Sequence, residues 1–322
     1  MKAFVYTAPG MASILQIDTP QIGPTECLVK PTMVGICHSD FDLLDGNYIL
    51  PFEYPVTPGH EWIGEVVEVG ANVTGFAIGD RVVGECSVAD DQHFGFTIDG
   101  AMSELMKVES AWLHKVPENM SDTVGALIEP FTVAYGATDK IDASDDVVIF
   151  GAGPIGLCAV VSASGKGGRV ILVEPDARRR ELGVALGASD TIDPTATNVV
   201  DEIRRLTDGR GATRVIEATG RPAVMAQTFE VACYGGYITN IGINVGDRSE
   251  AYLGLIVEKN LSIRGQVGSV GVWPPAIKFL ERQTADLSQI VSSEFPLDQA
   301  REALAASAAR DKNIKIHVRP QG

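Results

Sequence analysis

The chain has 322 residues, 45% of them hydrophobic and 21% charged, the composition of an ordinary globular protein long enough for two domains. Its formal net charge of −16, without a basic stripe, argues against nucleic acid as a partner. No apolar run approaches the roughly 18 residues of a membrane-spanning helix, so no membrane partner is expected. The five scattered cysteines form no C-x-x-C pair, which argues against a disulfide framework and favours a cytoplasmic protein.

The N-terminal third predicts an irregular β-rich domain. Short β-like runs separated by proline and glycine turns predict hairpins, and the start of the chain indicates a first strand, not a signal peptide. We expect strands over residues 3–6, 14–18, 26–30, 30–36, 64–70 and 80–84. The strand over 30–36 leads into GICHSD (35–40), and an aromatic loop then leads to Gly59, His60 and Glu61.

From about residue 123 the pattern changes to strands that alternate with helices. A helix over Val124–Ala137, interrupted at Glu129-Pro130, opens this region. Strands are then expected over 147–150, 169–173, 214–217, 237–241 and 261–264, with helices near 155–164 and 176–186. Cys158 and Cys233 are expected in helical stretches as buried apolar side chains. The alternation indicates an α/β fold, a doubly wound parallel sheet with helices on both faces.

The C-terminal tail predicts a return to the first domain. From Trp273 onward we expect a helix, a short strand at 294–295, an amphipathic helix over 297–308 and a final strand over 314–318. The expected domains are therefore residues 1–129 together with 269–322, and residues 130–268.

The stretch VVIFGAGPIG (147–156) predicts a dinucleotide-binding turn in the second domain, which makes that domain a Rossmann domain. A strand enters the turn, the first glycine permits the bend, the second lets backbone approach a pyrophosphate, and the third lets helix and strand pack closely. The start of the helix offers N–H groups and a positive dipole end to the anion. The residues expected to contact the cofactor here are Gly151, Gly153, Pro154, Ile155 and Gly156.

The next strand ends at Glu174, near the position of a ribose-binding acid. Its carboxylate would accept hydrogen bonds from the ribose 2′- and 3′-hydroxyls and repel a 2′-phosphate, which favours NAD over NADP. Arg178, Arg179 and Arg180 follow it. An arginine of this run, with Arg179 as the candidate, could pair with a 2′-phosphate, or the run could be a solvated helix face.

Residues of the types that bind a borderline-soft divalent metal occur at Cys37, His60, Glu61 and Glu129. A catalytic zinc takes three protein ligands and keeps one position open, which Cys37, His60 and a carboxylate from Glu61 or Glu129 would supply. By themselves these residues favour a buried cysteine, a hydrogen-bonded histidine and two surface glutamates, because single histidine and glutamate positions are common. Beside a dinucleotide-binding fold they favour a metal site.

Motifs in one family's order cover nearly the whole chain: GICHSD (35–40), PGHE (58–61), DRVVG (80–84), IEP (128–130), GAGPIG (151–156), VIEATG (215–220) and GQVGS (265–269). On them the chain resembles the zinc-containing medium-chain dehydrogenases of alcohols and polyols, in the branch of sorbitol, glucose and threonine dehydrogenases. The resemblance implies a GroES-like catalytic domain beside the Rossmann domain and a homo-oligomer, a dimer or tetramer. It also implies hydride transfer between NAD and a secondary alcohol, such as a polyol, sugar or cyclitol, giving the ketone.

The resemblance also implies roles for single residues. Ser39 would relay the proton of the substrate hydroxyl, with His38 near the cofactor's pyrophosphate or in the same relay; both could instead cap the helix that begins there. Asp40 would orient the ligand His60 through its ring N–H. Glu61 would either bind the metal or act behind it.

One feature of the family is missing from the sequence. Many members carry four closely spaced cysteines that hold a structural zinc, whereas the interval after DRVVG contains only Cys86. We therefore expect one catalytic zinc and no structural zinc, and we expect His93 of the shortened loop at the surface. Residues from other loops are expected beside the substrate or the cofactor, namely Tyr48, Phe52, Glu53, Thr219 and the stretch 269–273.

Two other functions compete with this interpretation. A zinc-free reductase of the same superfold would reduce quinones or enones with NADPH, but it has no need of the cysteine, histidine and glutamate set. A non-catalytic protein would bind a dinucleotide as a sensor or scaffold, and the fold alone does not exclude it.

Overall fold

The computed structural model describes residues 1–48, 50–89, 92–244, 246–269 and 271–321. Contacts divide the chain into two compact units: unit 1 is Met1–Glu129, Gly268–Arg282 and Val291–Gly322, and unit 2 is Pro130–Val267 and Gln283–Ile290. The sequence predicts residues 283–290 in the first domain, but they group with unit 2. The reason is a short 3₁₀ helix, η2 (Leu287–Ile290), which buries Leu287 and Ile290 and packs against α4 (Pro154–Gly165).

Unit 1 is mainly antiparallel. Its strands are β1 (Lys2–Ala8), β2 (Met11–Gln16), β3 (Glu26–Gly35), β4 (Glu61–Val69), β5 (Arg81–Gly84), β6 (Ser87–Ala89), β7 (Gln92–His93), β8 (Met106–Glu109), β9 (Leu113–Lys115), β16 (Val291–Pro296) and β17 (Lys315–Arg319). Its helices are α1 (Ser39–Leu44), α2 (Asp122–Gly125), α9 (Trp273–Glu281) and α10 (Ala300–Ala308), with 3₁₀ helices η1 (Ser110–Trp112) and η3 (Leu297–Gln299).

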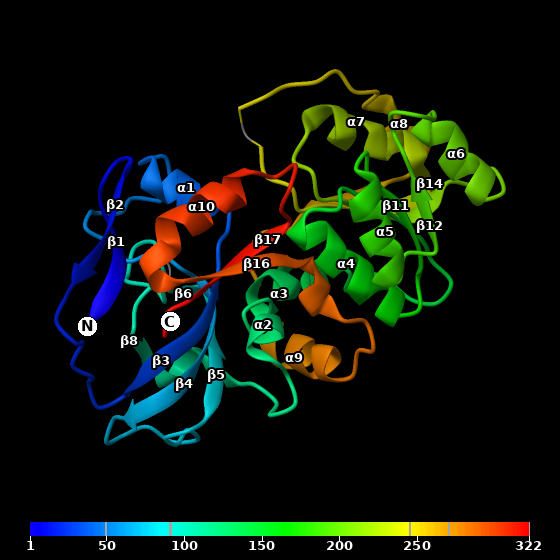
Figure 1. Ribbon diagram of the computed structural model, residues 1–322. Helices are drawn as coiled ribbons and strands as arrows, with labels where there is room; N and C mark the ends of the chain where they lie inside the picture. The colour runs from blue at the N-terminus through cyan, green and yellow to red at the C-terminus, as the bar shows by residue number, and fades with distance from the viewer. Residues whose placement is uncertain (49, 90–91, 245, 270, 322) are drawn as a thin grey trace. The chain divides into compact units, whose positions relative to one another are not determined.

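The large sheet of unit 1 has the order β16-β17-β3-β4-β5-β9, and β8 also pairs with β3. Strand β17 pairs with β3, so the last strand of the chain returns to the first unit (Figure 1). Apolar side chains from several strands fill the core, including the buried rings of Phe4, Tyr6, Trp62 and Phe94. This core holds the end of β3 and the start of β4, where the candidate metal ligands lie.

Unit 2 is the predicted parallel sheet. Its strands are β10 (Asp146–Phe150), β11 (Arg169–Val173), β12 (Asp190–Ile192), β13 (Ala212–Glu217), β14 (Ala232–Asn240) and β15 (Ser262–Gly265). Besides α4 and η2, its helices are α5 (Ala177–Ala185), α6 (Val199–Leu206), α7 (Pro222–Val231) and α8 (Gly254–Glu258), and α3 (Ile128–Ala137) begins at the boundary between the units. No helix in the described part of the chain is long and apolar enough to cross a membrane.

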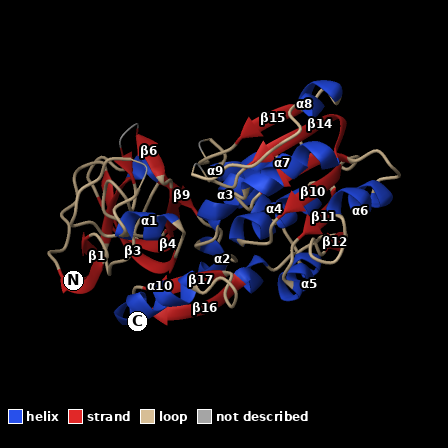
Figure 2. Cartoon of the chain, turned by 90° about the horizontal axis from the view of Figure 1, so that it is seen from above, coloured by secondary structure: helices blue, strands red, loops and turns tan. Residues whose placement is uncertain are grey.

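The order of these strands is β12-β11-β10-β13-β14-β15, and the pairs are parallel. Helices α4 and α5 cover one face of the sheet, and α6 and α7 cover the other (Figures 1 and 2). The doubly wound fold predicted from the alternating pattern is confirmed. The strand order reverses beside β10, the position at which such sheets bind nucleotides.

Two local predictions are wrong. Cys233, predicted in a helix, lies in β14, because the glycines that follow it end the helical stretch and Gly235 has a φ of +74°, outside any right-handed helix. The helix predicted over 124–137 is two helices, and the break falls at residues 126–127, not at Pro130. A proline in the first turn of α3 removes no hydrogen bond, so Pro130 is tolerated there.

Candidate metal centre and dinucleotide turn

The register of β3 and β4 brings candidate ligands from separate segments together. In this antiparallel pair Gly35, at the end of β3, lies opposite Glu61, at the start of β4. Cys37 follows β3 closely and His60 directly precedes β4, so both lie at the same end of the pair. The Cys37 sulfur, a ring nitrogen of His60 and a carboxylate oxygen of Glu61 lie within 4.8 Å of one another.

This cluster has the chemistry of a zinc site. A thiolate, an imidazole and a carboxylate are ligand types of zinc, and a catalytic zinc takes three of them and leaves one position open. His60 and Glu61 are buried and Cys37 is half-buried, so the cluster is shielded yet reachable. The residues present therefore fit the metal.

Asp40, in the first turn of α1, connects two members of the cluster. Its Oδ2 accepts a hydrogen bond from the backbone N–H of Cys37 at 2.8 Å, and its Oδ1 lies 3.7 Å from Nδ1 of His60. Burial lowers the pKa of His60, but Asp40 and Cys37 together outweigh burial and hold this pKa well above its ordinary value. The pocket therefore favours positive charge at this point, the property that a cation site needs.

A buried lysine that the sequence analysis misses lies beside the cluster. Nζ of Lys315, in β17, forms an ion pair with Oε2 of Glu61, and both side chains are almost fully buried. Burial lowers the pKa of Lys315, but Glu61 and Cys37 outweigh it and raise that pKa above its ordinary value. A Cβ at Gly35 would clash with the Glu61 carboxylate, so the glycine makes room for the pair. The available sequence signal was a lysine within the apolar final strand.

Glu129, in the first turn of α3, lies outside the cluster but close to it. Burial raises the pKa of Glu129 to about 7; the charge of His60 lowers this pKa and that of Glu61 raises it. Glu61 is therefore the carboxylate within the cluster, and Glu129 is a second carboxylate within electrostatic reach of it.

Aromatic rings lie against the cluster. The ring centroid of Phe96 is 4.6 Å from that of His60, and Tyr48 stacks on Phe96 at 4.2 Å with nearly parallel planes. Phe52 meets Tyr48 edge-on at 6.4 Å, whereas Glu53 is exposed. Of the predicted pocket residues, Tyr48 thus connects to His60 through Phe96, a residue of the shortened loop that the sequence analysis did not single out.

Ser39 and His38 lie at the start of α1. His38 occupies the N-cap position, is exposed and makes no side-chain capping bond. Its Nδ1 instead lies 2.6 Å from Nη2 of Arg310. Ser39 is the first residue of the helix and is half-buried, directly between His38 and Asp40 in the chain.

Among its described residues, the shortened loop contributes no ligand to the cluster. His93 is half-buried in β7, with its Nδ1 3.3 Å from the Ser87 hydroxyl, so it is less exposed than predicted. Burial raises the pKa of Cys86 to about 12. The predicted pocket stretch 269–273 includes residue 270, which lies outside the described residues; within the stretch, Nε1 of Trp273 donates to the Ser269 hydroxyl at 3.1 Å.

In unit 2 the glycines of the turn have different structural reasons. Gly151 has a φ of +95°, a conformation that other residues rarely adopt. A Cβ at Gly156 would overlap the carbonyl oxygen of Gly151, so only glycine lets α4 start so close to the turn. Nothing lies within 4 Å of the Cβ position of Gly153, the N-cap of α4, which leaves space for a ligand. Pro154 and Ile155 then open the helix, whose first N–H groups have no intrahelical partner.

Glu174, directly after β11, lies beside this turn. Its carboxylate accepts hydrogen bonds from the backbone N–H groups of Ala152 at 2.8 Å and Asp176 at 3.0 Å. Arg179 donates to the Ala152 carbonyl at 3.3 Å. Glu174 and Arg179, which are both predicted to bind the cofactor, are therefore in contact with the glycine turn.

Thr219 reaches the turn from the strand on the other side. Its Cγ2 lies 2.8 Å from the Cβ position of Gly151. Its backbone N–H and its hydroxyl both donate to the carboxylate of Glu217, which is fully buried at the end of β13. The turn after β10 is therefore flanked by two carboxylates, Glu174 after β11 and Glu217 in β13.

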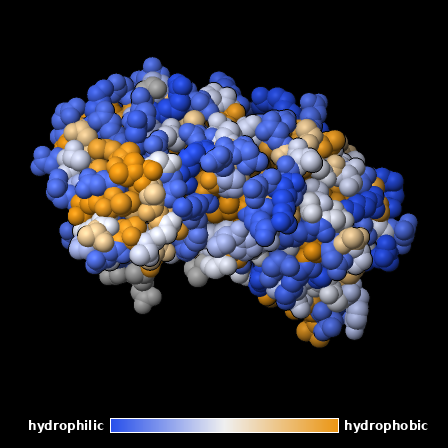
Figure 3. Space-filling view, turned by 90° about the horizontal axis from the view of Figure 1, so that it is seen from below, coloured by the Kyte–Doolittle hydropathy of each residue, from blue (hydrophilic) through white to orange (hydrophobic). Residues whose placement is uncertain are grey.

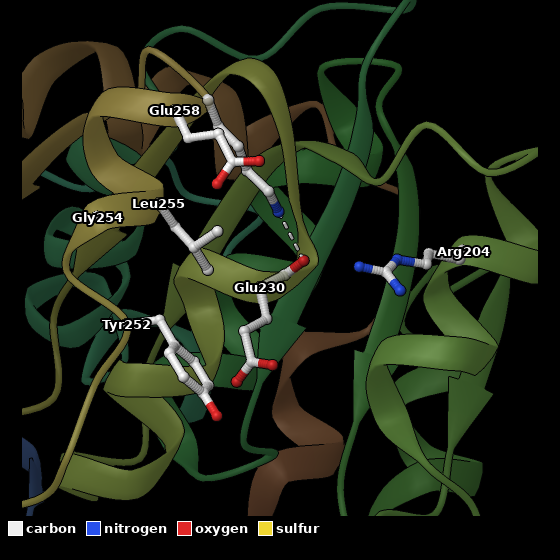
Figure 4. A pocket seen from close by; sticks show the side chains of 7 residues that line it. Arg204, Glu230, Tyr252, Gly254, Leu255 and Glu258 are labelled. Carbon is white, nitrogen blue, oxygen red and sulfur yellow. Dashed lines mark hydrogen bonds between the residues drawn. The ribbon is translucent and has the colours of Figure 1, made fainter.

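A separate pocket of about 450 Å³ in unit 2 is lined by Arg204, Glu230, Tyr252, Gly254, Leu255, Glu258 and Lys259. Figure 4 shows Arg204 across from Glu230 and Tyr252, and Nζ of Lys259 donates to the Glu230 carbonyl at 2.8 Å. An adjoining pocket reaches Gly211 and Ala232, at the amino ends of β13 and β14. Because nucleotides bind at the carboxyl ends of parallel strands, this pocket is not the dinucleotide site.

Known families match the two parts of the chain that carry these sites. Residues 23–118 match the Alcohol dehydrogenase GroES-like domain, and residues 154–282 match the Zinc-binding dehydrogenase family. The chain is 31% identical to (R,R)-butanediol dehydrogenase of Bacillus subtilis, over 95% of this chain and 96% of that protein. It is 32% identical to scyllo-inosose 3-dehydrogenase of Thermotoga maritima, over 94% of this chain and 88% of that protein. A Sinorhizobium meliloti 1021 structure described as a zinc-binding dehydrogenase bound to NADP has a TM-score of 0.92 at 29% identity, covering 99% of both chains.

Proposed function

The chain belongs to the zinc-dependent medium-chain dehydrogenase family, and we propose that it oxidises a secondary alcohol to a ketone with NAD as the hydride acceptor. The observation that carries this proposal is the convergence of Cys37, His60 and Glu61 in a chain that also has an open glycine turn after β10. A zinc-free quinone or enone reductase has no need of such a cluster, so that alternative is not favoured. A purely binding protein would have no need of it either.

Cys37 and His60 would hold the zinc, with the third ligand drawn from Glu61 or Glu129. Because Nδ1 of His60 faces Asp40, Nε2 remains for the metal and Asp40 fixes the ring orientation. Lys315 balances the charge of Glu61, so the loaded site keeps more positive charge toward the substrate oxygen. Zinc held there would lower the pKa of the substrate hydroxyl.

Ser39 and His38 would carry the hydroxyl proton away. Ser39 would accept the hydrogen bond of the substrate hydroxyl and pass its proton on. A guanidinium only donates hydrogen bonds, so Nδ1 of a neutral His38 accepts from Arg310 and its Nε2 carries the proton. To take the proton from Ser39, Nδ1 of His38 would have to give up the hydrogen bond from Arg310, and the imidazolium so formed would release its Nε2 proton to solvent from the exposed ring.

The turn and its neighbours favour NAD. Glu174 keeps a buried carboxylate beside the turn, where it would bind ribose hydroxyls and repel a 2′-phosphate. Of the neighbouring arginines, Arg178 pairs with Asp176 at 3.1 Å and Arg180 pairs with Asp193 at 3.1 Å. These acidic partners oppose the recruitment of either arginine to a 2′-phosphate.

One zinc per chain and a hydroxylated substrate complete the proposal. Cys86 is the only cysteine in the interval where relatives with a structural zinc need four, and one thiol cannot replace them. The two relatives described above act, by their names, on butanediol and scyllo-inosose. A polyol, sugar or cyclitol would place a secondary hydroxyl at the cluster, with Tyr48 and Phe96 as its apolar wall.

We also propose a homo-oligomer, formed through the edge of the unit 2 sheet. Among the described strands, β15 has one sheet neighbour, β14. Exposed apolar side chains surround this edge: Tyr252, Leu253, Val257, Ile263 and Val267. Figure 3 shows hydrophobic side chains projecting at the α8 end of the unit, at the lower right of the view. A second copy pairing edge to edge would satisfy the backbone and cover these side chains.

The function is tested by assay and metal analysis of the purified protein. A panel of polyols, sugars, cyclitols and simple secondary alcohols with NAD should give reduced cofactor, and metal analysis should find about one zinc per chain. Absence of zinc from an active enzyme would contradict the metal site. For the oligomer, Val257→Lys should lower the mass measured by light scattering to that of one chain, whereas the control Ile78→Lys, at an exposed apolar position of unit 1, should not.

A further inference from the structure

Glu217 is a buried carboxylate that takes no part in the proposed metal site or substrate pocket. It ends β13, directly opposite Phe150, the last residue of β10. A buried carboxylate is costly unless its oxygens accept hydrogen bonds. Here it accepts from the Thr219 N–H at 2.7 Å, from the Thr219 hydroxyl, and from the Gly220 N–H at 3.1 Å. The carboxylate therefore fixes the loop over residues 218–220.

Thr219 carries this constraint to the glycine turn. Its Oγ1 donates to Glu217 and accepts from the N–H of Arg221, the N-cap residue of α7, at 3.0 Å. These two bonds leave the side chain a single orientation, in which Cγ2 packs against Gly151. The methyl group thus contacts the turn at Gly151, whereas the Cβ position of Gly153 has no neighbour within 4 Å.

The packing around the carboxylate is tight on its other side as well. A Cβ at Gly242 would lie 2.7 Å from Oε2 of Glu217 and 2.6 Å from Cα of Gly220. Gly220 has a φ of +69°, so the loop has a conformation that most residues would not adopt. A glutamine at residue 217 would keep one acceptor oxygen and lose the other, and a shorter side chain would leave the N–H groups of this loop without their acceptor.

Resting on the proposed binding of NAD by unit 2, we propose that Glu217 is a positioning residue of the cofactor site. Its carboxylate holds Thr219 against Gly151 and so keeps the backbone N–H groups of the turn and of the start of α4 aimed at a pyrophosphate. Glu174 holds the same turn from the opposite strand through Ala152. Glu174 also has a ribose to bind, whereas Glu217 acts only through the loop.

Glu217→Gln tests this role, because it keeps the size of the side chain but replaces one acceptor oxygen with an NH₂ donor. We expect the Kd for NADH and for ADP-ribose to rise about tenfold, or roughly 1.4 kcal/mol. Because the turn binds the pyrophosphate and not the reacting carbon, kcat at saturating NAD should change less than about twofold. Adenosine, which has no pyrophosphate, should bind to both proteins alike. The matched control Glu230→Gln, on α7 at the pocket of Figure 4, should leave every value unchanged.

Variants of Thr219 separate its hydroxyl bond to Glu217 from its methyl contact with Gly151. Thr219→Ser keeps the hydroxyl bonds and removes the methyl group, so it should weaken NADH binding about as much as Glu217→Gln. Combined, the two substitutions should cost little more than either alone, because they act through one contact. Thr219→Val keeps a methyl group in place and should bind NADH more tightly than Thr219→Ser.

The outcomes distinguish this inference from the function on which it rests. A Glu217→Gln protein that melts at a lower temperature but binds NADH like the Glu230→Gln control would overturn the positioning role. Fully additive effects in the double variant would overturn the link through Thr219. A wild-type protein that binds neither NADH nor NADPH would instead overturn the proposed function. Should Glu217→Gln fail to fold, Thr219→Val decides the question, because it keeps a methyl group at Gly151 but loses the hydroxyl bond to Glu217: NADH binding weaker than in the wild type supports the role of the carboxylate, and wild-type binding overturns it.

Discussion

The candidate metal cluster of unit 1 and the glycine turn of unit 2 are built in opposite ways. The cluster joins side chains from distant segments, with Cys37 after β3, His60 and Glu61 at β4, and Lys315 in the last strand. The turn lies within residues 151–156, and it depends on the absence of side chains. The first site is therefore a product of strand register, and the second is a product of local sequence.

The two regions also handle buried charge differently. In the cluster, ionisable side chains face one another, and their charges must balance through Lys315, through a proton or through a cation. Beside the turn, Glu174 and Glu217 are satisfied mainly by backbone N–H groups of adjacent loops. Damage to the cluster should therefore be nearly complete, whereas damage to the turn should be graded and selective.

The largest effect is expected from Cys37→Ser. Loss of the thiolate should remove zinc, and because bound metal lowers the pKa of a ligated hydroxyl by several units, kcat/KM should fall at least about 10⁴-fold. Dinucleotide binding should persist, because the turn lies in the other unit. Activity assays, metal analysis and NADH titration measure the three quantities. The control Cys233→Ser changes a thiol that is also half-buried and should leave all three unchanged; a fully active Cys37→Ser protein would remove Cys37 from the ligand set.

A second large effect is expected from Lys315→Met. It leaves the buried carboxylate of Glu61 without its cation, so the free energy of unfolding of the zinc-free protein should fall by about 3–5 kcal/mol. Added zinc should recover part of this loss, because the metal supplies the missing positive charge. Urea unfolding with and without a chelator measures both values.

The control for that experiment is Lys107→Met, which breaks the exposed pair between Lys107 and Glu26, 2.9 Å apart. An exposed pair of this kind contributes about 0–1 kcal/mol. Equal losses in the two variants, or no response of Lys315→Met to zinc, would show that the buried pair is not coupled to the metal site.

A smaller and more selective effect is expected from Gly153→Ala. The backbone there has a φ of −74°, which alanine adopts freely, and nothing lies within 4 Å of the new Cβ. The melting temperature should therefore stay unchanged, while the added methyl group occupies the space for the pyrophosphate and raises the Kd for NADH roughly tenfold. Gly156→Ala is the contrasting variant, because its Cβ would overlap Gly151 and should lower the melting temperature as well. Normal NADH affinity in Gly153→Ala would place the pyrophosphate elsewhere.

The glycine turn, which is local in sequence, is easier to predict than the cluster, which depends on strand register. In unit 2 the predicted strand over 169–173 coincides with β11, and the glycine turn lies where the motif indicates, because strand, turn and helix are neighbours in the chain. In unit 1 the residue types of the cluster were predictable, but their meeting depends on Gly35 lying opposite Glu61, and a pairing register is not a local pattern. Lys315 was missed for the same reason, since its partner Glu61 is distant in the sequence.

Glu217 shows a second limit of sequence reasoning. It belongs to the quoted motif VIEATG, yet only the conformation of the following loop shows that its carboxylate accepts from Thr219 and Gly220. A turn signal predicts where the chain bends but not which buried group holds the bend. The roles proposed for Ser39 and His38 depend on a bound substrate, and they stay predictions.

The smallest expected effect compares the two carboxylates that flank the turn. Glu174→Ala removes the repulsion of a 2′-phosphate as well as the bond to Ala152, so NAD binding should weaken while NADP binding weakens less or improves. The ratio of kcat/KM for NADP to that for NAD should then rise roughly tenfold. Glu217→Gln should weaken both cofactors equally and leave the ratio unchanged, because its effect passes through Thr219 to a turn that meets the pyrophosphate of either cofactor. An unchanged ratio in Glu174→Ala would mean that this carboxylate, like Glu217, only holds the turn, and that it does not support the proposed preference for NAD.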